Sequence, residues 1–312
     1  MENDRIGVLL MALGGPDSLD AVEPFLLNVR HGRPTPKQMV EEFRERYRRI
    51  GGKSPLLGIS LEQAQALEAR LNRGTDAFRC YVGMRHWSPY VRETVARIRD
   101  DHVHRVVAIC LTPYYSKMSV GAYFADLDNA ITRSGATFEL AHVESWHDCR
   151  ELIDAYANKA RQALTRLAGD GFGDPSVLFT AHSLPQKIMA EGDPYERELQ
   201  QTMAAISKQL PPVRARLCYQ SAGRSGDSWL GPPLDDVLND LGAAGEQAVL
   251  VVPFGFVSDH LEILYDLDIE ARARARDLGM RFERAESLNA DPQFIRAMEA
   301  VVRDAAAMPN WA

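Results

Sequence analysis

The sequence predicts an α/β protein made of two similar domains, each a doubly wound parallel sheet. Short apolar, β-branched runs alternate with amphipathic helical stretches along the 312 residues, as in right-handed βαβ units. Runs such as 6–13 and 247–256 are apolar continuously rather than in alternation, which is typical of strands covered on both faces. Two stretches, 104–130 and 247–273, also share one layout: a strand, a proline, an aromatic-rich turn, a serine, and a helix containing Asp-Leu-Asp.

Eight strands are expected, with helical patterns between nearly all of them. The strands lie at 6–13, 78–84, 104–113, 138–143, 176–183, 214–221, 247–256 and 280–287. Clear helices are predicted at 89–101, 149–169 and 291–307. Asp291 is a plausible N-cap of the last, and Pro292 suits its first position.

The domains are expected to join near residues 145–175, where the sequence GDGFGDPS supplies turn residues, and the boundary is placed at residue 148. The first domain is 1–148 and the second is 149–312. The final helix is expected to be able to pack back on the first domain.

Composition excludes several classes of protein. The chain is 46% hydrophobic and 25% charged, with a net charge of -7, which argues against a general nucleic-acid binder. No uncharged apolar run reaches the roughly 18–20 residues of a membrane span. The N-terminal apolar run has no cleavage site and is interpreted as the first strand, so a cytoplasmic protein is expected.

The four cysteines do not form a metal-binding motif. Cys80, Cys110, Cys149 and Cys218 are scattered, and no C-x-x-C pair occurs. A zinc site or an iron–sulfur cluster built from local pairs is therefore not expected. Four reduced thiols, mostly buried near strands, are predicted.

An acidic stripe stands out in DHLEILYDLDIE, residues 259–270. On a regular helix Asp259, Glu262, Asp266 and Glu270 share one broad face, although like charges at such spacing repel. Asp259 could cap the helix, but capping does not explain the two acids deeper in it. One interpretation is an oxygen-rich track for a divalent cation, and the other is a solvated face.

TAHSLP, residues 180–185, directly follows a predicted strand. Ligands of open α/β sheets bind at the carboxyl ends of strands. His182 there can accept a proton or bind a metal, although a histidine hydrogen-bonded under a loop remains the alternative. The segment lacks G-x-S-x-G, so Ser183 is not interpreted as a nucleophile.

Two other kinds of segment indicate a ligand. Aromatic residues lie next to Gly and Ser in YYSKMSVGAYF and YQSAGRSGDSWLGPP, as walls for a flat ring would. NVRHGRPTPK, residues 28–37, gathers Arg30, His31, Arg33 and Lys37, and guanidinium groups bind carboxylates well. Each feature is weak alone.

In combination these segments resemble the ferrochelatase family from residue 6 to about 300. The motifs are LLMALGGP, IGGKSPL, GMRHWSPY, VESWHD, FTAHSLP, GDPYERELQQT, YQS, WLGPP, PFGFVSDHLEILYDLDIE and DPQFI. The resemblance implies insertion of ferrous iron into a porphyrin, in a cleft between two similar Rossmann-like domains. It implies that His182 and Glu262 are the catalytic pair at the porphyrin centre and metal ligands, and that Asp266 and Glu270 continue an acidic line for metal or protons. The substrate-binding residues it indicates are Leu13, Arg30, Arg33, Ser54, His86, Tyr115, Lys117, Tyr123, Ser221 and Trp229. For His86, a plain structural role is the alternative.

The chain looks most like the compact bacterial enzymes that metallate coproporphyrin III, whose four propionates suit Arg30 and Arg33. One departure favours protoporphyrin IX as the second candidate: Leu13 stands where the coproporphyrin type usually has Tyr. Fe(II) is expected as a substrate, with no permanently bound cofactor and no iron–sulfur cluster. A monomer with transient contacts to neighbouring heme-pathway enzymes is expected.

Three alternatives stay open. A sirohydrochlorin cobalt or iron chelatase would usually carry additional histidine ligands where this chain has acids. A non-catalytic tetrapyrrole-binding protein would need the aromatic and basic walls but not His182 with Glu262. A two-domain sugar- or amino-acid-binding protein would normally be exported.

Overall fold

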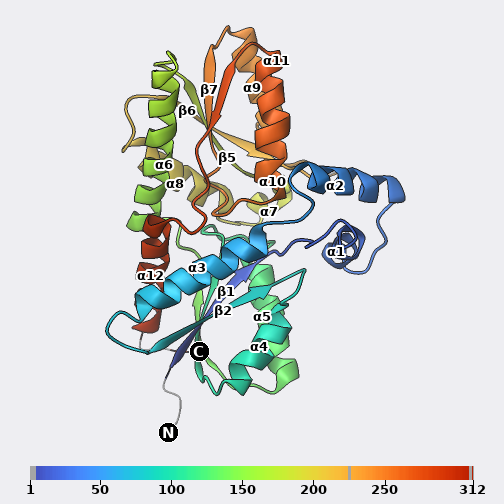
Figure 1. Ribbon diagram of the computed structural model, residues 1–312, viewed down its shortest axis with the longest axis vertical. Helices are drawn as coiled ribbons and strands as arrows, with labels where there is room; N and C mark the ends of the chain where they lie inside the picture. Colours follow the sequence, from blue (N-terminus) through green and yellow to red (C-terminus); the bar gives the residue numbers. More distant parts are fainter. Residues whose placement is uncertain (1–4, 224–225, 309–310, 312) are drawn as a thin grey trace. The chain divides into compact units, whose positions relative to one another are not determined.

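The chain folds into two compact units, seen in the ribbon of the computed structural model (Figure 1). The structure describes residues 5–223, 226–308 and 311. The first unit comprises Met1–Trp146 and Asn289–Ala312, and the second comprises His147–Leu288. The chain thus enters the second unit once and returns to the first for its last helix.

The first unit contains a four-stranded parallel sheet in the order β2-β1-β3-β4. Its strands are β1 (Ile6–Ala12), β2 (Phe78–Met84), β3 (Arg105–Cys110) and β4 (Glu139–Val143). Leu9 of the central strand lies between Tyr81 and Ala108. All seven residues of β1 are buried, as expected for a strand covered on both faces.

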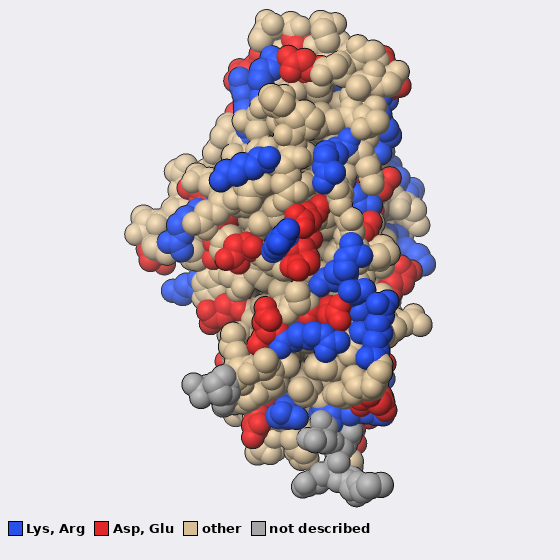
Figure 2. Space-filling view, turned by 90° about the vertical axis from the view of Figure 1, so that its left-hand side faces the viewer, with Lys and Arg blue, Asp and Glu red and all other residues tan. Residues whose placement is uncertain are grey.

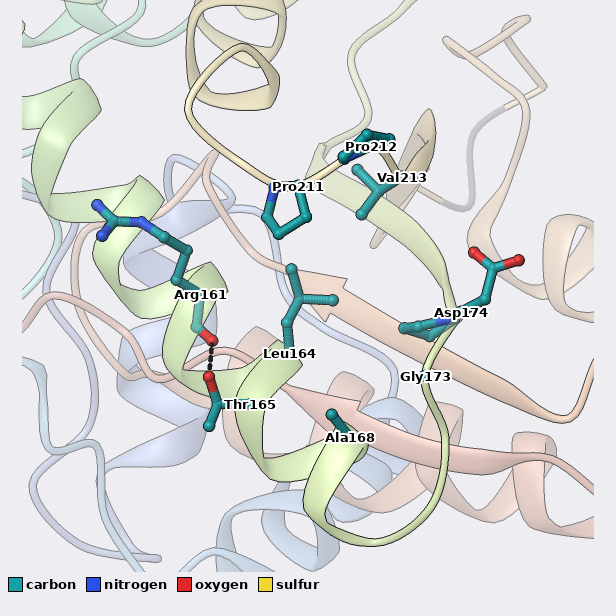
Figure 3. Close-up of a pocket in the computed structure, with 10 residues that line it drawn as sticks. Arg161, Leu164, Thr165, Ala168, Gly173, Asp174, Pro211, Pro212 and Val213 are labelled. Atoms are coloured by element: carbon teal, nitrogen blue, oxygen red, sulfur yellow. Dashed lines mark hydrogen bonds between the residues drawn. The ribbon is translucent and has the colours of Figure 1, made fainter.

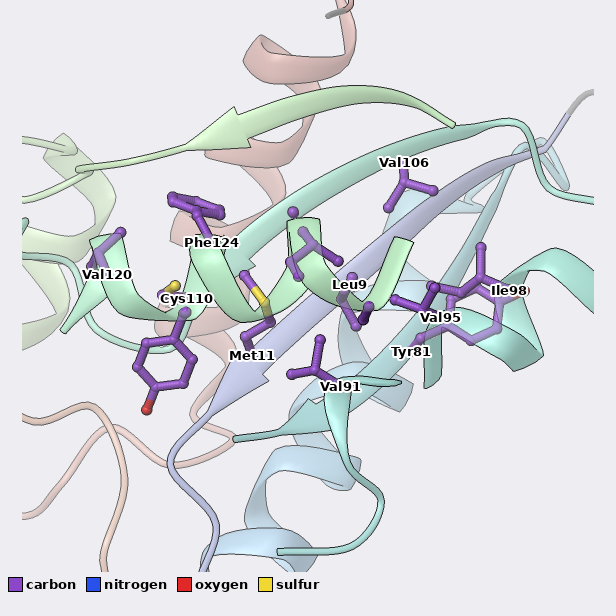
Figure 4. Close-up of a cluster of buried hydrophobic side chains, with 14 of the residues drawn as sticks. Leu9, Met11, Tyr81, Val91, Val95, Ile98, Val106, Cys110, Val120 and Phe124 are labelled. Carbon is purple, nitrogen blue, oxygen red and sulfur yellow. The ribbon is translucent and has the colours of Figure 1, made fainter. Parts of the chain in front are cut away.

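The helices of the first unit are α1 (Val22–Val29), α2 (Lys37–Arg49), α3 (Leu56–Leu71), α4 (Val91–Asp100), α5 (Val120–Ser134) and α12 (Pro292–Ala306). Both faces of the sheet are covered by α3, α4, α5 and α12, whereas α1 and α2 contact each other. Side chains of α4 and α5 pack with Leu9 and Met11 in one core cluster (Figure 4). Because successive strand residues point to opposite faces, Val8 and Leu10 face the other side, where α3 and α12 contact the sheet. Asp291 caps α12 through Gln293 N (2.8 Å), and Pro292 opens it, as predicted.

The second unit repeats the same strand order, β6-β5-β7-β8, again all parallel. The strands are β5 (Ser176–His182), β6 (Arg214–Gln220), β7 (Ala248–Val252) and β8 (Arg281–Arg284). Its helices are α6 (Arg150–Gly169), α7 (Gln186–Ala190), α8 (Tyr195–Ser207), α9 (Leu234–Ala243), α10 (Leu261–Leu264) and α11 (Arg272–Asp277), with a π-helix, η1 (Asp266–Ala271). The α/β fold class, with two parallel-sheet units, is therefore confirmed.

The order of strands locates a switch point in each sheet. In the second unit the chain turns outward from β5 to β6 on one side and returns to β7 on the other. The crevice at the carboxyl ends of two such central strands is where open α/β sheets bind ligands. The residues that follow β5 and β7 therefore lie at this crevice.

The expectation of one regular helix over 259–270 is wrong. Asp259 lies before the helix, whose N-cap is His260, and α10 ends after a single turn. Tyr265 O then accepts bonds from both Ile269 N (3.1 Å) and Glu270 N (3.0 Å), and the second is the i→i−5 bond of a π-helix. Asp259 therefore lies outside the helix, and the other three acids are divided between one α-helical turn and the π-helix that follows it.

The cysteines and the surface add little chemistry. Cys110 and Cys218 are buried and Cys80 and Cys149 are half-buried, all as free thiols. Among the described helices, none combines the length and the apolar character that crossing a bilayer requires. On the face drawn in Figure 2, basic and acidic side chains are interspersed.

Candidate active site

His182 is the last residue of β5, at the switch point of the second sheet. Its carbonyl oxygen accepts a hydrogen bond from the buried Tyr195 hydroxyl (3.0 Å). The next residue, Ser183, is bonded through its backbone to Gln220 O and donates its hydroxyl to Leu230 O, both at 2.8 Å. Three hydrogen bonds therefore hold the backbone at His182 and Ser183, and the Ser183 hydroxyl is used in one of them.

Glu262 approaches His182 from the segment after β7. Its Oε2 lies 3.0 Å from Nδ1 of His182, and the two side chains are 29% and 34% exposed. On the backbone, Gln220 Nε2 donates to Glu262 O (2.7 Å). Residues 80 positions apart thus form one polar pair that solvent and ligands can still reach.

The electrostatics of the pair favour its charged form. Burial would lower the pKa of His182, but the Glu262 carboxylate, its hydrogen bond, and the charge of Asp266 together raise it above the ordinary value. Burial would raise the pKa of Glu262, but the charge and the hydrogen bond of His182 lower it to about 2. Glu262 is therefore a carboxylate at neutral pH and accepts the Nδ1 proton.

This arrangement leaves Nε2 as the reactive atom of the imidazole. With its Nδ1 proton donated to Glu262, a neutral His182 carries its lone pair on Nε2. That nitrogen can take a proton or ligate a borderline metal, and the carboxylate stabilises the imidazolium that results.

Asp266 and Glu270 differ in their exposure and in their contacts. Ser221, in a left-handed backbone conformation (φ 59°), donates its hydroxyl to Asp266 Oδ2 (2.6 Å). Asp266 is half-buried and close enough to influence His182, whereas Glu270 is exposed on the π-helix. No group of three or more His, Cys, Asp or Glu side chains within the described ranges has an arrangement able to hold a metal ion.

Sequence reasoning missed three residues that shape this site. Gln220 and Tyr195 position Glu262 and His182 through the backbone. His260 precedes α10, and burial lowers its pKa, so it is neutral beside the pair. Tyr195 lies in the family motif GDPYERELQQT and His260 lies in PFGFVSDHLEILYDLDIE. The local sequence at neither position indicates which residue it contacts in the folded protein.

Two predicted residues of the first unit meet at the carboxyl edge of its sheet. Leu13, 39% exposed, follows β1, and its carbonyl accepts from His86 N (2.9 Å). His86 Nδ1 in turn lies 2.8 Å from Asn28 Oδ1, at the end of α1. Burial and Arg85 lower the pKa of His86 to about 4, so His86 is a neutral hydrogen-bond donor. It joins the loop at Leu13 to the loop of residues 30–33, which we call the arginine loop.

The arginine loop has an ordered shape. Arg30 Nε donates to Arg33 O (3.3 Å), and Arg33 Nε donates to Arg30 O (3.2 Å). The turn between them uses left-handed His31 (φ 53°) and Gly32 (φ 80°). The reciprocal bonds engage only Nε of each guanidinium, so the terminal nitrogens of both groups can face an anion.

Other predicted substrate residues have structural contacts. Tyr123 is buried in the core of the first unit, with Arg85 over its ring, so its side chain packs rather than faces a ligand. The backbone N–H of Ser54 donates a hydrogen bond to Pro16 O (2.8 Å), at the end of the turn formed by residues 14–16. Tyr115 and Lys117 follow β3 at the same edge as Leu13, and Trp229 packs against Gly223 in the second unit.

A hollow of about 320 Å³ lies elsewhere on the second unit (Figure 3). Its lining comes from α6 and from the turns that precede β5 and β6, so it lies at the amino edge of the sheet, opposite His182. It has one Arg and one Asp as charged groups, and it offers no catalytic constellation. The lining residues are Arg161, Leu164, Thr165, Ala168, Gly173, Asp174, Pro175, Pro211, Pro212 and Val213.

Comparison with known proteins agrees with the geometry. A family profile described as ferrochelatase matches residues 5–306. A ferrochelatase from Herpetosiphon aurantiacus is 41% identical over 300 residues, which are 96% of this chain and 98% of that protein. A coproporphyrin III ferrochelatase from Anoxybacillus flavithermus is 37% identical over 305 residues, 97% of this chain and 96% of that one.

A solved structure supports the fold alone. The cobalt complex of a sirohydrochlorin chelatase from Bacillus subtilis subspecies spizizenii has a TM-score of 0.60 at 12% identity, and the match covers 98% of this chain and 97% of that one. The family identification predicted from the motifs is confirmed by the sequence relatives, which share a third or more of their residues with it over nearly their whole length. This chain belongs to the ferrochelatase family.

Proposed function

We propose that this chain inserts Fe(II) into coproporphyrin III, giving coproheme in heme biosynthesis, with His182 and Glu262 as its catalytic pair. The observation that carries the proposal is the 3.0 Å contact between His182 Nδ1 and Glu262 Oε2 at the switch point of the second sheet. A hydrogen-bonded imidazole and carboxylate are the groups that the reaction requires.

The reaction removes two pyrrole protons from the macrocycle as Fe(II) enters it. Nε2 of His182 takes the two protons one after the other, passing the first to solvent before it accepts the second, and Glu262 stabilises the imidazolium each time through Nδ1–H. The imidazole nitrogen and the carboxylate oxygen are also ligands that ferrous iron accepts. Because Nε2 holds either a proton or a metal, proton uptake and metal ligation alternate on the same atom. The one-third exposure of the pair lets protons leave for solvent.

Asp266 and Glu270 extend this chemistry outward. Asp266 raises the pKa of His182, so it makes the imidazole a stronger base. Glu270 is exposed and forms the outer end of the acidic line, where it meets hydrated iron or released protons. The two acids transfer iron or protons, whereas His182 and Glu262 remove the pyrrole protons and bind the entering iron.

The arginine loop supports coproporphyrin as the substrate. Its terminal guanidinium nitrogens suit the propionates of the porphyrin rim, and coproporphyrin III has four of them. The relative from Anoxybacillus flavithermus is itself named a coproporphyrin III ferrochelatase. Protoporphyrin IX is the second candidate because exposed Leu13 and Leu27, 39% and 42% accessible, offer an apolar rim.

The deciding experiment is anaerobic Fe(II) insertion with coproporphyrin III and protoporphyrin IX in parallel, followed by absorbance. The variant Arg30→Ala with Arg33→Ala should raise KM for coproporphyrin by at least tenfold and for protoporphyrin by much less. The matched control is Arg73→Ala with Arg133→Ala, which removes two exposed charges elsewhere on the first unit. Preference of the parent protein for protoporphyrin would overturn the substrate assignment.

Two further expectations belong to this proposal. The enzyme needs no permanently bound cofactor, so metal analysis of the purified chain should find no stoichiometric metal or cluster. It works as a cytoplasmic monomer that meets neighbouring heme-pathway enzymes only transiently. Sedimentation at micromolar concentration should give a mass near 34.8 kDa, and a stable dimer would contradict this.

A further inference from the structure

The segment that carries Glu262 and Asp266 is irregular, and something must hold it in register. It runs from Asp259 through one turn of α10 into the π-helix. A π-helical insertion is rare and frequently lies at a functional site. The contacts that the segment makes with the rest of the second unit are therefore of interest for its position.

One side chain on a neighbouring strand contacts both ends of this segment. Arg284, the last residue of β8, donates from Nε and Nη2 to the two oxygens of Asp268, at 2.8 and 2.7 Å. Its Nη1 lies 3.6 Å from Asp259 Oδ1. The guanidinium is 12% exposed and therefore largely withdrawn from solvent.

The contact with Asp259 is reinforced. Ser287 donates its hydroxyl to Asp259 Oδ1 (2.7 Å), and Arg284 Nη1 also reaches Ser287 Oγ (3.4 Å). At the other end, Arg272 donates to Asp268 Oδ1 (3.3 Å). A planar guanidinium with donors on fixed sides thus sets the separation of Asp259 and Asp268.

Glu262 lies between those two carboxylates in the chain. Its carbonyl is held by Gln220 on the sheet side, and its side chain must meet His182 at 3.0 Å. A displacement of either end of the segment would move Glu262 relative to an imidazole that is anchored separately on β5. Errors of about 1 Å in such geometry cost on the order of a hundredfold in rate.

We propose that Arg284 is a positioning residue, which clamps Asp259 and Asp268 so that Glu262 is aligned with His182. This inference rests on the proposed role of His182 and Glu262. Arg284 touches no reacting atom, and it acts through the backbone of residues 259–268.

The test compares Arg284→Met with the matched control Arg281→Met in the full-length protein. Arg281 lies on the same strand and pairs with Asp170 (2.8 Å) in an exposed position. Arg284→Met should lower kcat per folded molecule at least tenfold and change KM for porphyrin less than about twofold. Arg281→Met should retain the parent kcat. Arg284→Lys, which keeps the charge but loses the two-pronged contact, should recover only part of the loss.

A second variant separates positioning from a general loss of fold. Asp268→Asn weakens the same clamp, and the double variant Arg284→Met with Asp268→Asn should be no slower than the slower single variant. Circular dichroism and thermal unfolding give the folded fraction of each protein. A kcat within twofold of the parent in folded Arg284→Met, or losses that multiply in the double variant, would overturn the clamp.

The proposed function fails separately. If His182→Ala and Glu262→Gln both retain turnover, the catalytic pair is wrong, whatever Arg284 does. If both lose turnover while Arg284→Met does not, only the positioning role of Arg284 is wrong.

Discussion

Glu262→Gln isolates the charge of the carboxylate that faces His182. The amide has almost the same shape, and its oxygen can still accept the Nδ1 hydrogen bond across 3.0 Å. Without the negative charge, burial becomes the dominant influence on His182, and its pKa must fall. The proton acceptor at Nε2 is active when neutral, so the acid limb of the pH–rate profile must move to lower pH.

The size of this shift follows from the contact. A hydrogen bond to a charged group contributes about 1.5–3 kcal/mol, and about 1.4 kcal/mol corresponds to one pKa unit. The side chains are 34% and 29% exposed, so solvent screening favours the lower end of the range. We expect a displacement of about one pH unit, together with a maximal rate at least tenfold lower because the carboxylate also serves the metal.

The assay is initial-rate insertion of Fe(II) under anaerobic conditions between pH 5 and 9, at saturating porphyrin. Asp277→Asn on α11 is the control, since it removes one exposed negative charge from the same region, where Asp277 pairs with its neighbour Arg276. The reasoning is refuted if the acid limb of Glu262→Gln coincides with that of the parent. It is equally refuted if Asp277→Asn shifts the limb by the same amount.

Other predictions concern stability. His86 has its pKa lowered to about 4 by burial and Arg85. The free energy of unfolding should therefore decline by roughly 3 kcal/mol as the pH falls from about 6.5 to 4. His86→Gln should make the free energy of unfolding less dependent on pH in this range, and an unchanged slope would contradict the prediction. Asp291→Ala removes the cap of α12 on Gln293 N (2.8 Å) and should cost about 1 kcal/mol, or a few degrees in Tm, whereas Asp291→Asn should cost much less. A Cβ on Gly15 would stand 2.5 Å from Ser54 Oγ, so Gly15→Ala should lower Tm and Ser54→Gly should restore it; a harmless single variant would refute the close packing.

Local sequence determined most of the elements. Each expected strand is present within a few residues, because buried parallel strands need continuous apolar runs. The strand predicted at 247–256 is longer than the observed strand β7, which ends at Val252. Pro253 follows and has no N–H for the ladder. The cap of the last helix could also be predicted, since an N-cap bond joins residues two positions apart.

The candidate site was only partly visible in the chain. His182 was found because it ends a strand, and Glu262 because it belongs to an acidic run. Their approach could not be read from spacing, since 80 residues separate them. It follows from the pairing of β5 with β7, which brings the two segments to one switch point.

The sequence by itself determined the parallel α/β units, the family motifs and the residue types able to move protons and bind iron. Only the tertiary structure decided how the acidic segment is wound. The same apolar and acidic residues can form an α-helix or a π-helix, and here Glu270 N bonds to Tyr265 O and Arg272 N bonds to Leu267 O, both in the i→i−5 pattern. The acids of the segment also meet residues that are distant in the chain, since Arg284 binds Asp268 and Asp259. Local spacing predicts a common face for the four acids, and long-range packing gives each a different environment.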